Sequence, residues 1–307
     1  MPPTSSKPRL ILVGSTATGK SDVAHIIARR QGWGIVSADA MMVYRGMDIG
    51  TAKPTPRERN GIAYAGLDLA DPSRRFNAHD FASAVERELE ADGGRHTWIV
   101  VGGTGLYVQA LLGGLPDVPG PNEAQRREAE VVLAGEGMAA LKAWCKARAS
   151  AIETWMPETD LENPRRWIRA LERGGPPDTS KITLPPGSIV VGLRRTREDL
   201  EDRITRRVDQ MYRNGLIDEV RTLRHQFGSL SDTAAKAIGY AEAMAVMDGK
   251  MTENEAKSAT MIRTRQYAKR QTTWFRHQFD TRWIDVAAQD PAESVAARVL
   301  AEWERHG

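Results

Sequence analysis

The chain has 307 residues, 41% of them hydrophobic and 27% charged, which is typical of a soluble globular protein with room for a core domain and a smaller insert. No run of sequence reaches the roughly 18 apolar residues that a membrane helix needs, which excludes a membrane-spanning protein. The single cysteine, Cys145, excludes an intramolecular disulfide and argues against a cysteine-based zinc site. We therefore expect a cytoplasmic protein with no membrane partner.

The net charge of +3 and the pI near 9.0 are only mildly basic, but Arg and Lys are unevenly distributed. They concentrate in residues 163–173, 192–215 and 262–278. This clustering makes a nucleic acid or another polyanion a candidate partner. Solvated helix faces would explain the same charges.

Four short apolar stretches predict buried strands at residues 9–13, 34–37, 97–101 and 188–193. Helical patterns separate them, which predicts an α/β fold with a parallel sheet. Two Pro/Gly-rich stretches, at 115–123 and 174–187, enclose a mostly helical region that is rich in Ala and Arg. We therefore expect a core made of residues 1–116 and 188–307, with an inserted helical subdomain at 117–187.

The sequence GSTATGKS, residues 14–21, follows the first predicted strand and precedes a helical pattern. In this arrangement, backbone N–H groups and a helix N-terminus surround a diphosphate or triphosphate. Lys20 would reach the terminal phosphate oxygens, and the Ser21 hydroxyl would ligate a magnesium ion that bridges them. A Gly-rich turn without a ligand is the structural alternative. The motif predicts bound phosphate groups but not the reaction that they undergo.

Asp39 follows the second predicted strand, at the sheet edge where the phosphate loop is also expected. Its carboxylate would accept a proton or hold the water shell of magnesium; the alternative is a helix N-cap. Further along the same segment, Asp48 and Lys53 either contact substrate or stabilise the loop, and we favour the loop role for Asp48.

Residues 100–112 repeat the order of strand, Gly-rich turn and helix, with Thr104 in the turn. The N–H groups and hydroxyl of this turn would point to the same edge of the sheet. A close contact between helix and sheet explains Gly102 and Gly103 equally well, but it explains Thr104 less well.

Residues 267–275, YAKRQTTWF, interleave basic and aromatic side chains. This pattern suits phosphate contacts with base stacking, although an amphipathic helix with buried aromatic residues is favoured by composition alone. His25 and His79 have no partner pattern, so we expect both to be structural.

Several separated motifs together resemble the tRNA dimethylallyltransferases, isopentenyl transferases that prenylate the adenosine beside the anticodon. The resemblance covers nearly the whole chain, and it depends on the co-occurrence of GSTATGKS, DAMMVYRGMDIGTAKP, GGTGLY and AKRQTTWF. It implies a P-loop NTPase or nucleoside-kinase-like parallel sheet core with a helical insertion that contacts the tRNA anticodon stem-loop. It also implies transfer of the dimethylallyl group of dimethylallyl diphosphate to N6 of adenosine, with Mg²⁺ bound and pyrophosphate released.

The resemblance assigns roles to particular residues of this sequence. The catalytic residues would be Asp39 as general base, with Arg207 and Lys20 at the leaving pyrophosphate. The diphosphate would be bound by Gly14, Thr16, Ala17, Thr18, Gly19, Lys20 and Ser21, with Ser21 as the metal ligand. The tRNA would be contacted by Asp39, Ala40, Met41, Met42, Thr104, Arg126, Arg165, Arg166, Trp167, Ile168 and Arg169. The chain departs from the usual family pattern at Ser15, where Pro is common, and at Ala40, where Ser is common.

Two other functions remain open from the residues alone. An ATP-dependent small-molecule or nucleoside kinase would use the same phosphate loop and carboxylate, but it does not require a basic insertion. An RNA-binding module switched by a bound nucleotide would transfer no group. For the oligomeric state we expect a monomer.

Overall fold

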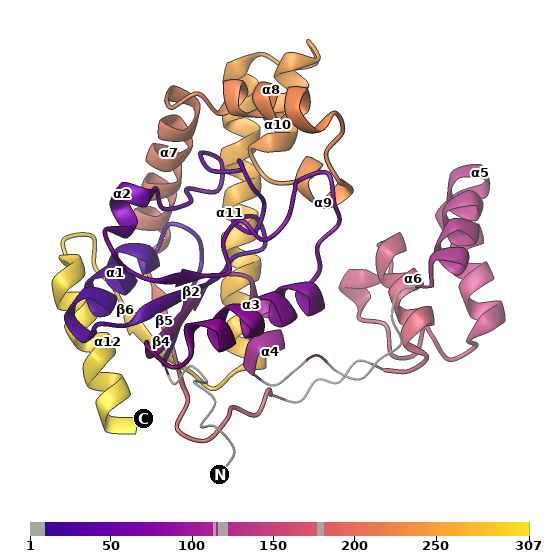
Figure 1. Cartoon of the computed structure of the whole chain (residues 1–307). Helices are drawn as coiled ribbons and strands as arrows, with labels where there is room; N and C mark the ends of the chain where they lie inside the picture. Colours follow the sequence, from indigo (N-terminus) through magenta and orange to yellow (C-terminus); the bar gives the residue numbers. More distant parts are fainter. Residues whose placement is uncertain (1–9, 113–114, 116–121, 177–180, 307) are drawn as a thin grey trace. The chain divides into compact units, whose positions relative to one another are not determined.

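The computed structural model describes residues 10–112, 115, 122–176 and 181–306 of the chain (Figure 1). The chain divides into two compact units, of which unit 1 comprises residues 1–115 and 181–307 and unit 2 comprises residues 116–180. Residues 181–187, assigned to the insertion from sequence, lie in unit 1. There the backbone N–H of Ile182 donates to the carbonyl of Gln278 (2.8 Å), and Ile182 and Leu184 pack against the core. No helix in these ranges is both long and apolar enough to cross a membrane.

Unit 1 is built on a parallel sheet, as the sequence predicted. Its strands within the described residues follow the order β3-β2-β4-β1-β5-β6 and are β1 (Leu10–Gly14), β2 (Gly34–Ala38), β3 (Tyr64–Ala65), β4 (Trp98–Gly102), β5 (Ile189–Arg194) and β6 (Thr281–Asp285). The strands predicted from apolar runs correspond to β1, β2, β4 and β5. Sequence reasoning missed β3 because it has only two residues, and β6 because its polar residues break the apolar run.

Helices cover both faces of the sheet, which is why its central strands are apolar throughout. Leu10 and Leu12 of β1 pack with α1 (Lys20–Gln31) and α12 (Ala292–His306), whereas Ile11 and Val13 face the opposite side. The other helices of unit 1 are α2 (Pro56–Arg59), α3 (Ala78–Asp92), α4 (Gly105–Leu112), α7 (Arg197–Arg213), α8 (Leu216–Phe227), α9 (Asp232–Ala235), α10 (Tyr240–Met247) and α11 (Glu253–Gln278).

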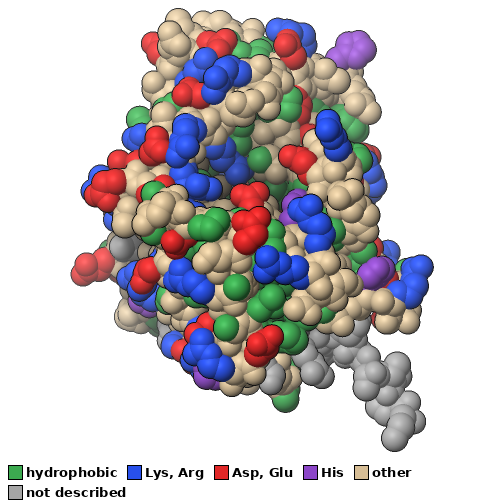
Figure 2. Space-filling view, turned by 90° about the vertical axis from the view of Figure 1, so that its left-hand side faces the viewer, with side chains coloured by type: hydrophobic (Ala, Val, Ile, Leu, Met, Phe, Trp, Pro, Cys, Tyr) green, Lys and Arg blue, Asp and Glu red, His purple; other side chains and the backbone are tan. Residues whose placement is uncertain are grey.

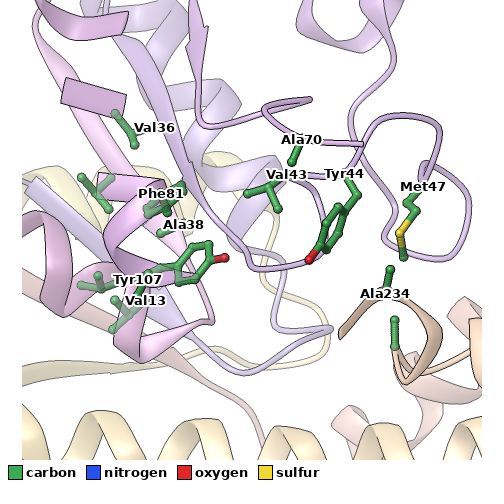
Figure 3. Packing of buried hydrophobic residues seen from close by; sticks show 14 of the residues in the cluster. Val13, Val36, Ala38, Val43, Tyr44, Met47, Ala70, Phe81, Tyr107 and Ala234 are labelled. Carbon is green, nitrogen blue, oxygen red and sulfur yellow. The ribbon is translucent and has the colours of Figure 1, made fainter. Parts of the chain in front are cut away.

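The larger core cluster anchors the chain that follows β2 (Figure 3). Val43, Tyr44 and Met47 are fully buried in it. In the same cluster Phe81 of α3 stacks on Tyr107 of α4, with ring centroids 4.2 Å apart and planes at 22°. Such aromatic pairs add about 0.5–1.5 kcal/mol beyond their area burial. The short turn between β2 and this anchored segment therefore has little freedom to move.

Unit 2 is helical and has a core of its own. It contains α5 (Glu123–Arg148), a short 3-10 helix (Glu158–Asp160) and α6 (Pro164–Arg173). Gly137, with φ of 82°, interrupts α5 and divides it into two helical parts. The buried residues of this core are Ala129, Leu141, Cys145, Ile152, Trp167, Ile168, Ala170 and Leu171.

Candidate active site

The carboxyl ends of three neighbouring strands meet at one edge of the sheet of unit 1. Gly102 of β4 pairs in register with both Val13 of β1 and Ala38 of β2. A Cβ at Gly102 would lie 2.2 Å from the carbonyl oxygen of Ala38, so only glycine allows this approach. The loops that follow the three strands line a single cavity of about 870 Å³. Figure 2 looks onto the side of unit 1 that carries α1, α2 and α7, where Lys and Arg side chains gather around a hollow.

The phosphate loop between β1 and α1 is fixed by its own hydrogen bonds. The Thr18 hydroxyl and the Lys20 ammonium both donate to the carbonyl of Ser15, at 2.9 and 2.7 Å. Ala17 and Gly19 adopt left-handed conformations, with φ of 65° and 92°. Because the Ser15 contacts use its backbone oxygen, the absence of the usual Pro leaves the loop geometry intact.

Most of the residues that were expected to hold the diphosphate face the cavity. Its lining includes Thr16, Ala17, Gly19, Lys20 and Ser21. Two of the predicted contacts have another position in the structure. Gly14 packs so closely on β5 that a Cβ there would lie 2.6 Å from the carbonyl oxygen of Leu193. Thr18 is buried and its hydroxyl is bonded inside the loop, so Gly14 and Thr18 shape the loop and do not line this cavity.

The three predicted catalytic side chains, Lys20, Asp39 and Arg207, lie on this cavity and affect one another electrostatically. Burial lowers the pKa of Lys20 to about 8, while Asp39 acts in the opposite direction and Arg207 adds to the lowering. Burial also lowers the pKa of Arg207, and Asp39 again opposes the change. Arg207 is held in place by a hydrogen bond from its guanidinium to the carbonyl of Thr51 (2.9 Å). The site therefore has two poorly hydrated cations that an anion would stabilise.

The Asp39 carboxylate fixes its own turn. Its Oδ1 accepts the backbone N–H groups of Met41 (2.8 Å) and Met42 (3.4 Å). The capping interpretation is thus correct in part, although residues 40–43 form a turn and not a helix. Among the described residues, no donor is hydrogen-bonded to Oδ2, so this oxygen can accept a proton from a substrate.

Thr104 links the turns that follow β2 and β4. Its hydroxyl accepts the backbone N–H of Ala40 (3.0 Å), and its own N–H donates to the carbonyl of Ala38 (3.2 Å). The contact to Ala40 needs no side chain, so Ala in place of the usual Ser preserves it. Of the residues expected to contact tRNA here, Met42 lines the cavity, whereas Ala40, Met41 and Thr104 form the adjoining turns.

Lys53 and Asp48 stabilise the loop that follows this turn. The Lys53 ammonium, whose side chain is 3% exposed, pairs with Asp48 (2.7 Å) and Asp68 (2.6 Å) and donates to the carbonyl of Tyr44 (2.7 Å). All of these contacts lie within the loop and its neighbours. These contacts support the loop role for both residues, and both residues also line the cavity, so a contact with substrate stays open as well.

The basic and aromatic segment at 267–275 forms part of the amphipathic helix α11. Phe275 is fully buried, and Trp274 packs edge-on against it with ring centroids 5.2 Å apart. Lys269 and Arg270 are exposed on the opposite face. Only Tyr267 and Gln271 of this segment line the cavity. The packing interpretation is correct for the aromatic pair.

Sequence reasoning missed three residues that contact the phosphate loop. Arg203 donates to the carbonyl of Ala17 (2.8 Å), and Arg195 donates to the carbonyl of Thr18 (3.0 Å). Gln271 accepts the N–H of Thr16 (2.8 Å). Arg203 lies one helical turn before Arg207, a spacing that does point to one face of α7. A glutamine within a helix gives no comparable signal.

In unit 2, two of the expected tRNA contacts are core residues. Trp167 is fully buried, its indole N–H donates to the carbonyl of Leu161 (2.9 Å), and Ile168 is 7% exposed. The structure gives these side chains a packing role in place of the contact that the resemblance implied. The reason is the period of α6, which turns them inward while their neighbours Arg165 and Arg166 remain exposed.

Arg126 and Arg169, also expected to contact tRNA, are joined by one buried carboxylate. Glu172, whose side chain is fully buried, accepts Arg126 Nε (2.7 Å), an Arg169 guanidinium nitrogen (3.2 Å) and the N–H of Asn122 (3.0 Å). Burial raises the pKa of Glu172, but these hydrogen bonds outweigh it, so the pKa lies below its usual value. Arg126 therefore links α5 to α6, whereas Arg169 pairs with Glu172 from within α6.

The cavity suits magnesium only together with a phosphate ligand. Within the described residues there is no group of three His, Cys, Asp or Glu side chains placed to hold a metal ion. The exposed Ser21 hydroxyl faces the cavity next to Lys20, with Asp39 on the same cavity wall. Magnesium commonly takes one or two protein oxygens and completes its shell with phosphate and water. The donor set fits that arrangement.

A parallel sheet, a phosphate-binding loop and a facing carboxylate define a P-loop protein with a fold like that of nucleoside kinases. A family model described as IPP transferase matches residues 42–278, and one described as isopentenyl transferase matches residues 8–70. The tRNA dimethylallyltransferases of Rhodococcus jostii and Streptomyces avermitilis are 39% and 38% identical to the chain, with 97% and 93% of each sequence covered. The crystal structure of a tRNA isopentenylpyrophosphate transferase from Bacillus halodurans is 33% identical, with 98% of both chains covered and a TM-score of 0.69. The chain belongs to the IPP transferase family.

The lowered pKa of Lys20 predicts how pyrophosphate affinity depends on pH. The ammonium loses its proton as pH rises through about 8, well below the ordinary 10.5. Affinity for inorganic pyrophosphate should therefore fall above pH 8, by at most about tenfold per pH unit. Between 8 and 10.5 the unfolded chain binds more protons than the folded one, so the contribution of Lys20 to the unfolding free energy rises with pH in that window.

Calorimetric titration between pH 7 and 9.5 measures the effect on affinity. Lys20→Arg is the control, because its guanidinium stays charged and pyrophosphate titrates identically in both experiments. A ratio of wild-type to variant affinity that does not change with pH would contradict the prediction.

Proposed function

We propose that the chain transfers the dimethylallyl group of dimethylallyl diphosphate to N6 of the adenosine 3′-adjacent to the tRNA anticodon and releases pyrophosphate. The observation that carries the proposal is the shared cavity of Lys20, Arg207 and Asp39 beside the phosphate loop, in a chain that belongs to the IPP transferase family. The curated relatives are named for this reaction.

The cations would act on the leaving group. As the allylic carbon–oxygen bond breaks, negative charge grows on the pyrophosphate. Lys20, Arg207 and the residues at the start of α1 line the cavity in which the pyrophosphate would lie, so they would stabilise that charge. Each such preorganised donor is commonly worth about 2.7–4 kcal/mol in mutational tests. When bound through Ser21 and the diphosphate oxygens, Mg²⁺ would supply further charge neutralisation.

Asp39 would act on the acceptor. The lone pair of an adenine amine is delocalised into the ring, so the amine is a weak nucleophile until its proton is removed. Oδ1 holds the turn, so the remaining oxygen, Oδ2, would perform this task. General-base catalysis of this kind typically contributes 10²–10⁴-fold. The amine proton moves to Asp39 as the carbon–nitrogen bond forms.

The RNA would be held by surfaces outside the cavity. A stacked base cannot reach such a site, so we propose that the target adenosine is extruded from the anticodon loop. The exposed Arg165 and Arg166 of unit 2 are candidates for phosphate contacts. The proposal also includes a monomer, and a reducing cytoplasm, which suits the buried Cys145 thiol.

Incubation with Mg²⁺, labelled dimethylallyl diphosphate and unmodified tRNA tests the function. We expect label in N6-isopentenyladenosine after digestion of the RNA. ATP consumption by a small-molecule acceptor without labelled RNA would instead favour the kinase. Nucleotide-dependent RNA binding with no modified base would favour the RNA-binding module.

Asp39→Asn separates base chemistry from the structure of the turn. The amide oxygen keeps the acceptor for Met41 and Met42, while the proton acceptor is lost. We expect kcat to fall by about 10²–10⁴-fold. Pyrophosphate affinity should stay the same or increase, because a negative charge beside Lys20 and Arg207 is removed. Full turnover by this variant would remove Asp39 from the mechanism.

The double variant Arg165→Ala/Arg166→Ala tests the RNA contact. If both arginines bind phosphates, tRNA affinity falls and its logarithmic salt dependence becomes shallower by about 2, one for each lost contact. Filter binding over a salt series measures this slope. Arg282→Ala/Arg305→Ala removes two exposed arginines from unit 1 as the matched control. Equal slopes for the two double variants would refute the assignment.

A further inference from the structure

A buried glutamine connects the phosphate loop to the acceptor side of the cavity. The side-chain amide of Gln271, a residue that is 5% exposed, accepts the N–H of Thr16 through Oε1 (2.8 Å) and donates from Nε2 to the carbonyl of Gly103 (2.9 Å). Thr16 follows β1, and Gly103 follows β4. One side chain from α11 therefore bridges the loops after two different strands.

The surrounding structure leaves this amide little room to move. A Cβ at Gly103 would lie 2.2 Å from Gln271 Nε2, so the amide packs directly onto the glycine backbone. Ala268 and Phe275, on the same face of α11, are buried in the core. Because the core around these two residues is close-packed, α11 cannot shift easily, and the position of the Gln271 amide relative to the sheet is fixed.

The bridge continues through hydrogen bonds to the residues on both sides of Asp39. Thr104, next to Gly103, donates its N–H to the carbonyl of Ala38 and accepts the N–H of Ala40. A path of short contacts thus runs from Thr16 through Gln271 to the turn that carries Asp39. The loop that would hold the donor and the base that would act on the acceptor are joined by this path.

We propose that Gln271 is a positioning residue that sets the distance between the bound diphosphate and the Asp39 carboxylate. A carboxamide is required because the site offers one N–H donor and one carbonyl acceptor. Glu would leave the Gly103 carbonyl without a donor and would place a charge beside the phosphate loop, whereas an apolar side chain would leave both backbone groups unpaired. The inference rests on the proposed function, and it names a residue that sets the geometry of the site for that reaction.

Gln271→Met, which keeps length and volume but removes both hydrogen bonds, tests this role. Misplacement of reacting groups by about 1 Å can cost on the order of 10²-fold in rate. We therefore expect kcat to fall by about 10–10²-fold, while pyrophosphate affinity and the KM for tRNA change little. Gln266→Met, at an exposed position of the same helix, is the matched control.

A double-mutant cycle with Asp39→Asn distinguishes positioning from general destabilisation. If Gln271 acts through Asp39, Gln271→Met has little further effect on kcat once the base is absent. Fully additive losses in variants that circular dichroism shows to be folded would overturn the proposal. If Gln271→Met does not fold, Thr104→Val replaces it, because this variant breaks the same path at its other end. We expect Thr104→Val to lower kcat in the same way and Thr104→Ser, which keeps the hydroxyl, to restore it.

The wild-type reaction separates this inference from the proposed function. Wild-type protein that transfers no dimethylallyl group overturns the function and the inference together. Wild-type transfer with an unchanged kcat for Gln271→Met overturns the inference alone.

Discussion

The site depends on the close approach of β2 and β4 at their carboxyl ends. Parallel strands end at one edge, and here the contact between the Ala38 carbonyl and Gly102 allows no side chain between them. Because β4 pairs with both β1 and β2, the segments that follow the three strands lie in one small region. These segments are the phosphate loop after β1, Asp39 after β2 and Thr104 after β4. A side chain at Gly102 would push Asp39 away from the phosphate loop even if every proposed catalytic residue were kept. The geometry of the site therefore depends on this packing constraint.

Electrostatics at this edge is arranged for a ligand that brings several negative charges. Lys20 and Arg207 are both poorly hydrated, and Asp39 compensates only part of that cost. A kinase would use the same arrangement, because its phosphate donor also places charge on the loop. The distinction between the two reactions lies in what Asp39 faces. In a kinase the carboxylate would meet a hydroxyl, whereas in this family it would meet an aromatic amine, whose weak nucleophilicity puts more of the catalytic demand on the leaving group.

The sequence predicted those parts of the site that are local in the chain. The loop at 14–21, the strand before it and the position of Asp39 follow from contiguous patterns, and the structure has them where they were expected. Gln271 lies 255 residues from Thr16, and only the folded structure shows that the two are hydrogen-bonded. The same limit explains unit 2, where a run of basic residues gave no means of separating the buried Trp167 from the exposed Arg165. Charge density indicates a segment, but helix phase and packing decide which side chains a ligand can reach.

Asp39 shows why the capping and catalytic interpretations of one carboxylate are compatible. A carboxylate has two oxygens, and Oδ1 is fixed by two backbone N–H groups of its own turn. Those hydrogen bonds orient the other oxygen, and the buried side chains of Val43, Tyr44 and Met47 hold the chain that follows the turn. The side chain therefore loses little conformational freedom when it accepts a proton, since folding has already imposed the orientation. Sequence presented the two roles as a choice, but one structure accommodates both, because the cap that uses Oδ1 would also position Oδ2 as the proposed base.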